Sequence, residues 1–293
     1  MSKRAFNWKC SIGEARVEQS LLAASGGTAH EFDDFAPKLT ERYHVYGITR
    51  RGFGSSGYIA GEYGIDVLGN DVLAVIATLK LDRPVLVGHS FAGGELSSVA
   101  MRHPNRVAGV IYLDAAYPVA FDNGKGMSMA EFQEIVQEPP VPTPGAADLA
   151  SFIALQAYYE RMDGIRLPEA ELRQKWEAMP EGRVGQRRSF PGSSALMKGT
   201  KKFTDIPVPA LLIFANPHSL GPWLDDNHDA SVRTAVKAYS AKVEAYTGKQ
   251  EQAIREAVPT ARVITLPGAN HFVFISNETD VLAEMHAFLA ALH

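Results

Sequence analysis

Short hydrophobic runs alternate along the chain with longer segments in which apolar residues recur at helical spacing. The short runs are rich in β-branched residues and are bounded by Gly, Pro or Asp, which predicts β-strands. These strands are expected at residues 43–49, 85–87, 107–113, 210–214 and 262–266. Helices are expected at residues 66–80, 90–102 and 279–292. The alternation predicts an α/β fold in which helices flank both faces of a mostly parallel central β-sheet.

The alternating pattern stops between about residue 117 and residue 206. A proline-rich piece, EPPVPTPG at residues 138–145, is followed by helical patterns without a predicted strand. We interpret residues 117–205 as a helical cap inserted into a core domain formed by residues 1–116 and 206–293. Helices in and after this region are expected at residues 152–161, 168–178 and 229–258.

Composition narrows the functional classes. The 293 residues carry a net charge of −4, which is too small to indicate a nucleic acid or a membrane as a partner. The one cysteine, Cys10, excludes an intrachain disulfide and fits a reducing compartment. The first twenty residues lack the apolar core of a signal peptide, and no run approaches the roughly 18 apolar residues of a membrane span. We therefore expect a cytoplasmic protein without a membrane partner.

The sequence contains no tight group of His, Cys and Asp at metal-ligand spacing. His218, His228 and Asp229 are too loosely spaced to predict such a site. We therefore expect neither a metal nor a cofactor, and a homodimer is left open.

Ser90 lies between a predicted strand and a predicted helix in the sequence VLVGHSFAGG. One interpretation is a helix N-cap, a position that serine favours. The other is a nucleophile, because Gly88, Ala92 and Gly93 are small enough to allow a sharp turn that leaves the hydroxyl projecting from the sheet. Such a turn would also aim the backbone N–H of Phe91 at developing negative charge.

This turn resembles the nucleophile elbow of the α/β-hydrolase superfamily, whose usual motif is G-x-S-x-G, with Ala92 in place of the second glycine. Three further stretches resemble family motifs in the same order along the chain. They are ITRRGFGSS at residues 48–56, VAGVIYLDAAYP at 107–118 and GANHFVF at 268–274. The resemblance covers nearly the whole chain, and it implies an α/β-hydrolase fold with a helical cap and a carboxylesterase-like serine hydrolase with a catalytic triad.

A serine hydroxyl needs a positioned base to become a nucleophile near neutral pH. His271 follows a predicted strand and a Pro-Gly turn, and it matches the position of the family's histidine. The alternative is a buried loop histidine that bonds to backbone. His89 directly precedes the serine and is expected to point away from the reaction, and His218 falls in a loop that the pattern does not define.

The resemblance implies an acid that orients His271 and stabilises its charged form. Family members most often carry this acid after the strand that follows the cap, but residues 215–219 (ANPHS) contain no carboxylate. The family's other location follows the strand that precedes the cap, where Asp114 stands. We therefore expect Asp114 to be the acid, with Asp225 and Asp226 as alternatives. A turn-capping role for Asp114 is the structural alternative.

The resemblance also implies two backbone N–H groups that bind the oxyanion. One belongs to Phe91, and the second to Ser25, which follows Ala23 and Ala24 where the family usually has His-Gly. The alternative for this stretch is a plain glycine turn before a helix.

The cap would roof the pocket and supply large apolar side chains, which indicates an apolar or aromatic acyl or alcohol group in the substrate. We expect about a third of the following residues to line the pocket: Phe121, Met127, Met129, Phe132, Phe152, Tyr158, Tyr159 and Trp176. Arg50 or Arg51 could contact an anionic group, but we expect them to fix their loop through backbone carbonyls.

The sequence thus predicts a serine hydrolase that cleaves a small, largely apolar carboxylic ester through an acyl-enzyme intermediate, with this small ester as its partner. Other α/β-hydrolase chemistry, such as C–C bond hydrolysis, lyase chemistry or cofactor-free oxygenation, uses the same fold. A non-catalytic ligand receptor is the third hypothesis.

Overall fold

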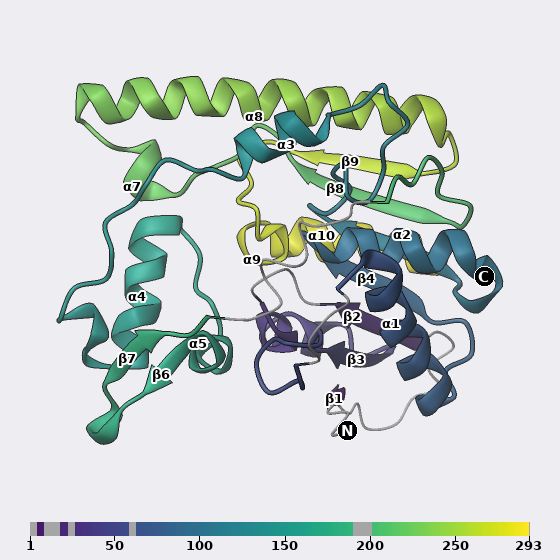
Figure 1. Cartoon of the computed structure of the whole chain (residues 1–293), viewed down its shortest axis with the longest axis horizontal. Coiled ribbons are helices and arrows are strands. Elements are labelled where there is room, and N and C mark those ends of the chain that lie inside the picture. Colours follow the sequence, from purple (N-terminus) through teal and green to yellow (C-terminus); the bar gives the residue numbers. More distant parts are fainter. Residues whose placement is uncertain (1–4, 9–17, 23–26, 59–62, 190–200, 293) are drawn as a thin grey trace.

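The computed structural model describes residues 5–8, 18–22, 27–58, 63–189 and 201–292. Its centre is a seven-stranded sheet with the order β1-β3-β2-β4-β5-β8-β9 (Figure 1). All neighbouring strands in it are parallel except β1 and β3. The strands are β1 (Ala5–Trp8), β2 (Glu18–Leu22), β3 (His44–Ile48), β4 (Val85–His89), β5 (Gly109–Leu113), β8 (Ala210–Ala215) and β9 (Arg262–Leu266). The expected mostly parallel sheet is confirmed.

The hydrophobic pattern located β3, β4, β5, β8 and β9 to within two residues, but it did not reveal β1 and β2. β1 has only four residues, and the sequence of β2, EQSLL, begins with three polar residues. β2 is nevertheless an inner strand, because β3 and β4 pair with its two edges. Pairing with neighbours, rather than local composition, therefore defines this strand.

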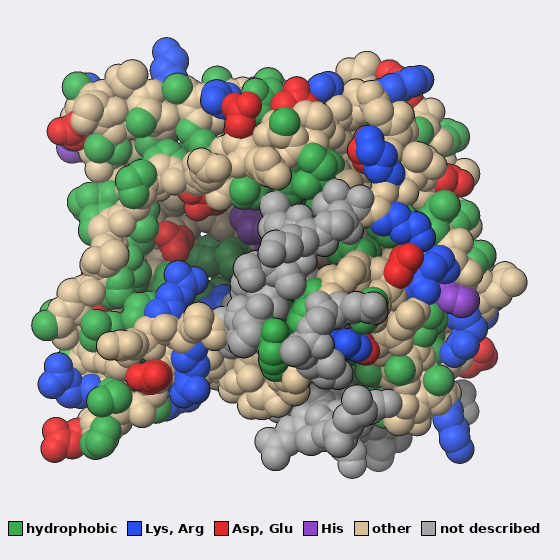
Figure 2. All heavy atoms as spheres, in the orientation of Figure 1, with side chains coloured by type: hydrophobic (Ala, Val, Ile, Leu, Met, Phe, Trp, Pro, Cys, Tyr) green, Lys and Arg blue, Asp and Glu red, His purple; other side chains and the backbone are tan. Residues whose placement is uncertain are grey.

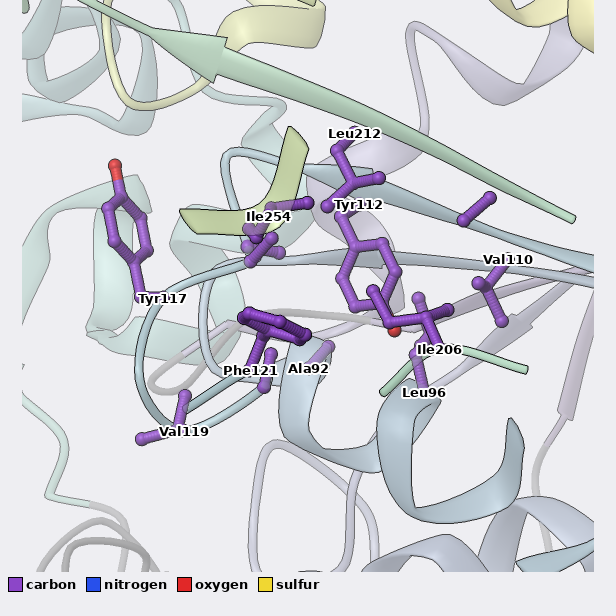
Figure 3. Close-up of a cluster of buried hydrophobic side chains, with 14 of the residues drawn as sticks. Ala92, Leu96, Val110, Tyr112, Tyr117, Val119, Phe121, Ile206, Leu212 and Ile254 are labelled. Carbon is purple, nitrogen blue, oxygen red and sulfur yellow. The ribbon is translucent and has the colours of Figure 1, made fainter. Parts of the chain in front are cut away.

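Helices cover both faces of the sheet and enclose two hydrophobic cores. On one face lie α1 (Ile65–Leu79), α2 (Ala92–Arg102) and α8 (Ala230–Ala257), and on the other α9 (Val273–Ser276) and α10 (Glu278–Ala290). Alternate side chains of β5 enter different cores: Tyr112 joins the first, whereas Ile111 and Leu113 join the second. Figure 3 shows the first core, with Tyr112 close to Leu212 and Ile206.

The segment between β5 and β8 contains α3 (Met129–Ile135), α4 (Phe152–Asp163) and α5 (Glu169–Lys175). Its first part packs into the first core, where Phe121 and Phe132 are buried. Residues between Phe152 and Val184 form a hydrophobic cluster of their own. In Figure 1 this second part, with α4 and α5, lies to the side of the sheet.

The expectation of a strand-free insertion is wrong. The helix predicted over 168–178 ends at Lys175, and β6 (Trp176–Ala178) pairs antiparallel with β7 (Val184–Arg187). Glu181 and Gly182 form the turn with φ values of 63° and 79°. Strands of three and four residues are too short for a period-2 pattern to be read from sequence.

Side-chain caps fix where several helices begin. Ser128 and Glu131 form a capping box at the start of α3, and Asp229 accepts hydrogen bonds from the first backbone N–H groups of α8. The short helix α7 (Pro222–Asp225) precedes α8. None of the described helices combines the length and the hydrophobicity needed to cross a membrane.

Gln250 of α8 ties this helix to the chain that follows β5. The fully buried amide donates to the carbonyls of Ala116 and Phe121, at 2.8 and 2.9 Å, and accepts from the Met127 N–H at 2.9 Å. We expect Gln250→Leu to lower the free energy of unfolding by about 3 kcal/mol, because it leaves these buried groups without partners. The melting temperature should fall by roughly 5–10 °C in a calorimetric scan.

The matched control for this prediction is Gln252→Leu on the same helix, where the side chain is exposed and bonds only to Glu256. Its effect should stay within about 0.5 kcal/mol. Equal melting temperatures for the two variants would contradict the anchoring role of Gln250.

Candidate active site

The sheet register brings the expected site residues to one edge. His89 at the end of β4 pairs with Leu113 at the end of β5, and Leu113 pairs with Ile213 of β8. Because these strands are parallel, Ser90 and Asp114 leave the sheet side by side at its carboxyl edge. The loops that follow β8 and β9 emerge at the same edge, where ligands commonly bind in open α/β sheets.

Ser90 occupies a strained turn and does not cap the helix that follows it. Its φ is 55°, a left-handed conformation that non-glycine residues rarely adopt. Helix α2 begins at Ala92 with Phe91 as N-cap and without a side-chain capping bond. The N-cap interpretation of Ser90 is therefore wrong, and the half-buried hydroxyl is left at the edge of the sheet.

Small residues around Ser90 are required for two different close approaches. A Cβ atom on Gly88 would lie 3.0 Å from the Ala92 Cβ and 2.8 Å from Leu96 Cδ1. A Cβ atom on Gly93 would lie 1.9 Å from the carbonyl oxygen of Ala115, in the chain after β5. The missing side chain of Gly93 thus allows the chain after β5 to pack closely against the start of α2, and it does not relieve crowding within the turn at Ser90.

Asp114 is fully buried and holds two imidazoles. Its Oδ2 accepts from His271 Nδ1 at 2.6 Å and lies 3.3 Å from His218 Nε2. Its Oδ1 accepts from the Tyr117 hydroxyl at 2.8 Å and from the Ala215 N–H at 3.1 Å. Burial by itself would raise the pKa of Asp114, but the hydrogen bonds from His218 and His271 outweigh it and hold the pKa well below its usual range.

His271 is set up as a base by this contact. Its Nδ1–H donates to Asp114, so the lone pair of the neutral ring lies on Nε2. Burial lowers the pKa of His271, but the hydrogen bond and the charge of Asp114 outweigh burial, and Glu138 and Glu31 add to the rise. The net shift of the pKa is upward from 6.5.

The structure does not bring the alternative acids to His271. Asp225 accepts from the Ser219 hydroxyl at 2.7 Å and from the Leu220 N–H at 3.3 Å, within its own loop. Asp226 is the C-cap residue of the short helix α7. Asp114 is therefore the carboxylate in contact with the candidate base, and its catalytic role stays a prediction.

Two histidines contact the candidate base or its carboxylate in ways that the sequence pattern did not define. His218, in the loop after β8, contacts the same carboxylate as His271, and the rings of His218 and His271 are 5.8 Å apart. His89 does not simply point away from the reaction. Its buried ring lies 4.5 Å from the ring of His271, and its Nε2 lies 3.0 Å from the His271 carbonyl oxygen. His218 lies four residues after the end of the predicted strand at residues 210–214, and this proximity was the available signal.

A pocket of about 200 Å³ opens over these groups. Its lining combines polar groups with apolar and aromatic side chains: Ser90, Phe91, Tyr117, Phe132, Ile135, Val136, Glu138, His218, Tyr239, Val243 and His271. Figure 2 shows the surface hollowed between α4 and the body of the sheet, with histidine and acidic side chains visible there. Ser90 and His271 thus share one small, largely apolar pocket.

Most of the expected pocket aromatics serve as core instead. Of that set, Phe132 lines the pocket, and Phe121 and Met127 belong to the first core. Phe152, Tyr158 and Trp176 form the separate cluster around α4. These side chains are buried by one another, because an inserted segment needs a hydrophobic core of its own.

A buried charge cluster joins α5 to the loop that follows β2. Glu171 accepts hydrogen bonds from the Thr28 N–H and hydroxyl, and Lys175 lies 3.1 Å from Glu171 and 3.4 Å from Glu31. Burial raises the pKa of Glu171 to about 7 despite the opposing charge of Lys175, and Glu31 adds to the rise. Ser25, the expected second oxyanion donor, lies outside the described residues. Within the described part of the loop that follows β2, the contacts of this cluster involve Thr28 and Glu31.

Neither arginine of the loop after β3 lines the pocket. Arg50 is buried and pairs with Glu95 of α2, and Arg51 pairs with Asp71 of α1. Carboxylates thus hold both guanidinium groups, and bonding to backbone carbonyls stays an expectation. Their guanidinium groups anchor the loop to the helices on one face of the sheet.

Comparison of the sequence with known proteins identifies the family of this chain. A model of the "Alpha/beta hydrolase family" matches residues 21–285. A non-heme haloperoxidase of Rhodococcus erythropolis is 25% identical over 256 residues, which is 84% of this chain and 82% of that protein. A bifunctional esterase/perhydrolase of Acinetobacter calcoaceticus is 35% identical over 82 residues, 28% of this chain and 30% of that enzyme. Several other curated relatives are likewise matched over about a third of their own length.

The fold also has close structural neighbours. The crystal structure of E-2-(acetamidomethylene)succinate hydrolase superimposes on this chain with a TM-score of 0.63 and is 16% identical to it in sequence. The superposition covers 94% of this chain and 91% of the hydrolase chain. At this identity the likeness concerns the fold alone.

The contact between Asp114 and His271 predicts the effect of Asp114→Asn. We expect turnover of a neutral ester to fall by about 10³- to 10⁴-fold with the fold intact, because Asn stabilises neither the tautomer nor the charge of the imidazole. In the wild type, the rate should fall with decreasing pH through an apparent pKa above 6.5, as the raised pKa of His271 requires. Loss of the Asp114 charge should move this limb to lower pH.

Asp225→Asn and Asp226→Asn are the matched controls, and both should retain wild-type turnover. Near-normal activity of Asp114→Asn, measured by steady-state kinetics alongside circular dichroism, would exclude Asp114 as the acid.

Proposed function

The chain belongs to the alpha/beta hydrolase family, and we propose that it cleaves a small, largely apolar carboxylic ester through an acyl-enzyme intermediate. One observation carries the proposal. A serine in a strained turn lines the same small pocket as a histidine whose far nitrogen is held by a buried carboxylate. The residue types and the contact between Asp114 and His271 are those of the constellation that activates a serine hydroxyl, which is recognised by geometry rather than by sequence position.

In the proposed reaction Ser90 attacks the ester carbonyl carbon while His271 Nε2 accepts the hydroxyl proton. The tetrahedral oxyanion is bound by the Phe91 N–H at the start of α2, together with a second N–H that we expect from Ser25. His271 then donates its proton to the leaving alcohol. Water repeats the sequence on the acyl-enzyme and regenerates Ser90.

Asp114 contributes by holding the imidazole. Its hydrogen bond to Nδ1 keeps the lone pair on Nε2, and its negative charge stabilises the imidazolium formed during attack. Tyr117 and Ala215 hold the carboxylate in place through its other oxygen. The carboxylate is therefore supported by a tyrosine that lines the pocket and by a backbone N–H of β8.

The pocket size supports a small substrate. A volume of about 200 Å³ lies below the range of about 300–1,000 Å³ that drug-sized ligands occupy. Phe132, Ile135 and Val136 come from α3 or directly after it, so the segment after β5 supplies the apolar wall. We propose that residues 117–205 act as the cap that sets this specificity.

Other chemistry on the same fold is the alternative. Relatives named as haloperoxidases and a 2-hydroxymuconate semialdehyde hydrolase show that matched proteins carry several activity names. Relatives named as esterases, including a carbendazim hydrolyzing esterase, support the ester reading. A non-catalytic receptor is disfavoured, because Ser90, His271 and Asp114 are all present at one edge of the sheet.

Charge at the pocket further narrows the substrate class. Glu138 is exposed and lines the pocket, and its charge contributes to raising the pKa values of His271 and Asp163. Among the described residues that line this pocket there is no Lys or Arg. An anionic substrate would therefore meet a carboxylate without a compensating cation, which favours neutral esters.

Ser90→Ala tests the nucleophile. We expect hydrolysis of short-chain p-nitrophenyl esters and labelling by a fluorophosphonate probe to disappear together in this variant, because no hydroxyl remains to attack either reagent. Thr28→Ser, which keeps a hydroxyl at a site away from the pocket lining, is a control for changes near the edge of the sheet. Wild-type labelling without esterolysis would favour the other chemistries, and neither activity would favour the receptor.

Glu138→Gln tests the charge preference. We compare kcat/KM for a neutral p-nitrophenyl ester with that for an ester of equal length that ends in a carboxylate. The variant should improve the relative rate on the anionic ester about five-fold, since a charge pair near a protein surface is worth roughly 1 kcal/mol. Glu134→Gln on α3, which removes an exposed charge paired with Lys242, should leave the ratio unchanged. Equal ratios in wild type and Glu138→Gln would refute the role of Glu138.

A further inference from the structure

Three side chains from three separate loops meet at the back of the pocket with the chemistry of metal ligands. We propose that Asp114, His218 and His271 form an inhibitory site for a divalent transition-metal ion of the Zn²⁺ class. One ligand atom from each residue lies within 4.8 Å of the other two. No sequence pattern indicated such a site, because these residues are more than 50 positions apart along the chain.

The donor types and distances suit zinc. Imidazole nitrogen and carboxylate oxygen bind Zn²⁺ at about 2.0–2.2 Å, so two ligands of a tetrahedral ion lie roughly 3.4 Å apart. Asp114 Oδ2 is 2.6 Å from His271 Nδ1 and 3.3 Å from His218 Nε2. Shifts of under about 1 Å would bring the three atoms to ligand spacing, and a water molecule could complete the tetrahedron.

The carboxylate ligand already has outer-shell support of the kind found in metal sites. Tyr117 and Ala215 occupy Oδ1 of Asp114, which leaves Oδ2 directed at the two histidines. His89 contacts the carbonyl oxygen of His271 and packs against its ring. Such partners orient ligands and raise the affinity for the ion.

Charge and access also favour a cation. Asp114 is fully buried, and among the described residues its ion-pair partners are only these two histidines, with no Lys or Arg. A buried carboxylate flanked by two imidazoles offers an incoming cation an opposite charge at close range. The side chains of His218 and His271 are 10% and 29% exposed, and both line the pocket, which provides a route for the ion.

Metal binding would stop the reaction through a tautomer change. A nitrogen that binds an ion must present its lone pair, so the proton of His271 Nδ1 would move to Nε2 through solvent, and a proton on His218 Nε2 would move to its Nδ1. Nε2 could then no longer accept the proton of Ser90. This consequence for turnover depends on the proposed function, whereas binding of the ion does not.

The test is a calorimetric titration of the full chain with ZnCl₂ in a buffer that does not chelate zinc. All proteins carry Cys10→Ser, so that the single thiol does not compete. We expect one ion per chain, with the affinity reduced at least 10-fold in His218→Asn. His228→Asn, which removes an exposed histidine after α7, should bind as the parent does. Equal affinity of the parent and His218→Asn would overturn the proposal.

Two further measurements separate failure of the site from failure of the proposed reaction. An anomalous difference map at the zinc edge, from zinc-soaked crystals of the parent, should place the ion between Asp114, His218 and His271, and a peak only elsewhere would overturn the site even if His218→Asn does not fold. Zinc should also abolish ester turnover reversibly, with activity restored by a chelator. Full turnover of a protein with zinc bound at this position would refute the inhibitory role.

Discussion

The buried carboxylate of Asp114 is the group on which the rest of the site depends. An ion removed from water costs several kcal/mol unless polar partners replace its hydration. Here four donors do so, from Tyr117, Ala215, His218 and His271. The same contacts keep the pKa of Asp114 low, so the group stays charged and fixes the tautomer of His271. The hydrogen bonds that offset the burial of Asp114 therefore also orient His271, the candidate base.

The sheet delivers Ser90 and Asp114 by the same means. Both residues directly follow paired positions on β4 and β5, and both have positive φ, 55° and 45°. A left-handed conformation costs a non-glycine residue about 1–2 kcal/mol, so each turn persists only because its surroundings hold it. The close approach of Gly93 to the Ala115 carbonyl binds the two turns together. The proposed nucleophile, Ser90, and the proposed acid, Asp114, therefore both adopt a strained backbone conformation at this edge of the sheet.

The insertion after β5 is coupled to this edge by charge as well as by apolar packing. Glu171 and Lys175 of α5 reach Thr28 and Glu31, and Glu31 lies 3.5 Å from the Nδ1 atom of His89. His89 in turn contacts His271. Buried polar groups thus lie between the insertion and the back of the candidate base, although no hydrogen bond joins Glu31 Oε2 to His89 Nδ1.

Several features of this protein follow from local sequence patterns. Short β-branched runs fixed five strands of the sheet, and the small residues around Ser90 identified the turn that carries it. The folded chain showed that Asp114, and not Asp225, contacts His271, added His218 to the site, and gave β2 its place in the sheet. Strand register and loop packing produce these contacts between residues far apart along the chain, such as His218 and Asp114, which are 104 positions apart, and no local pattern encodes them.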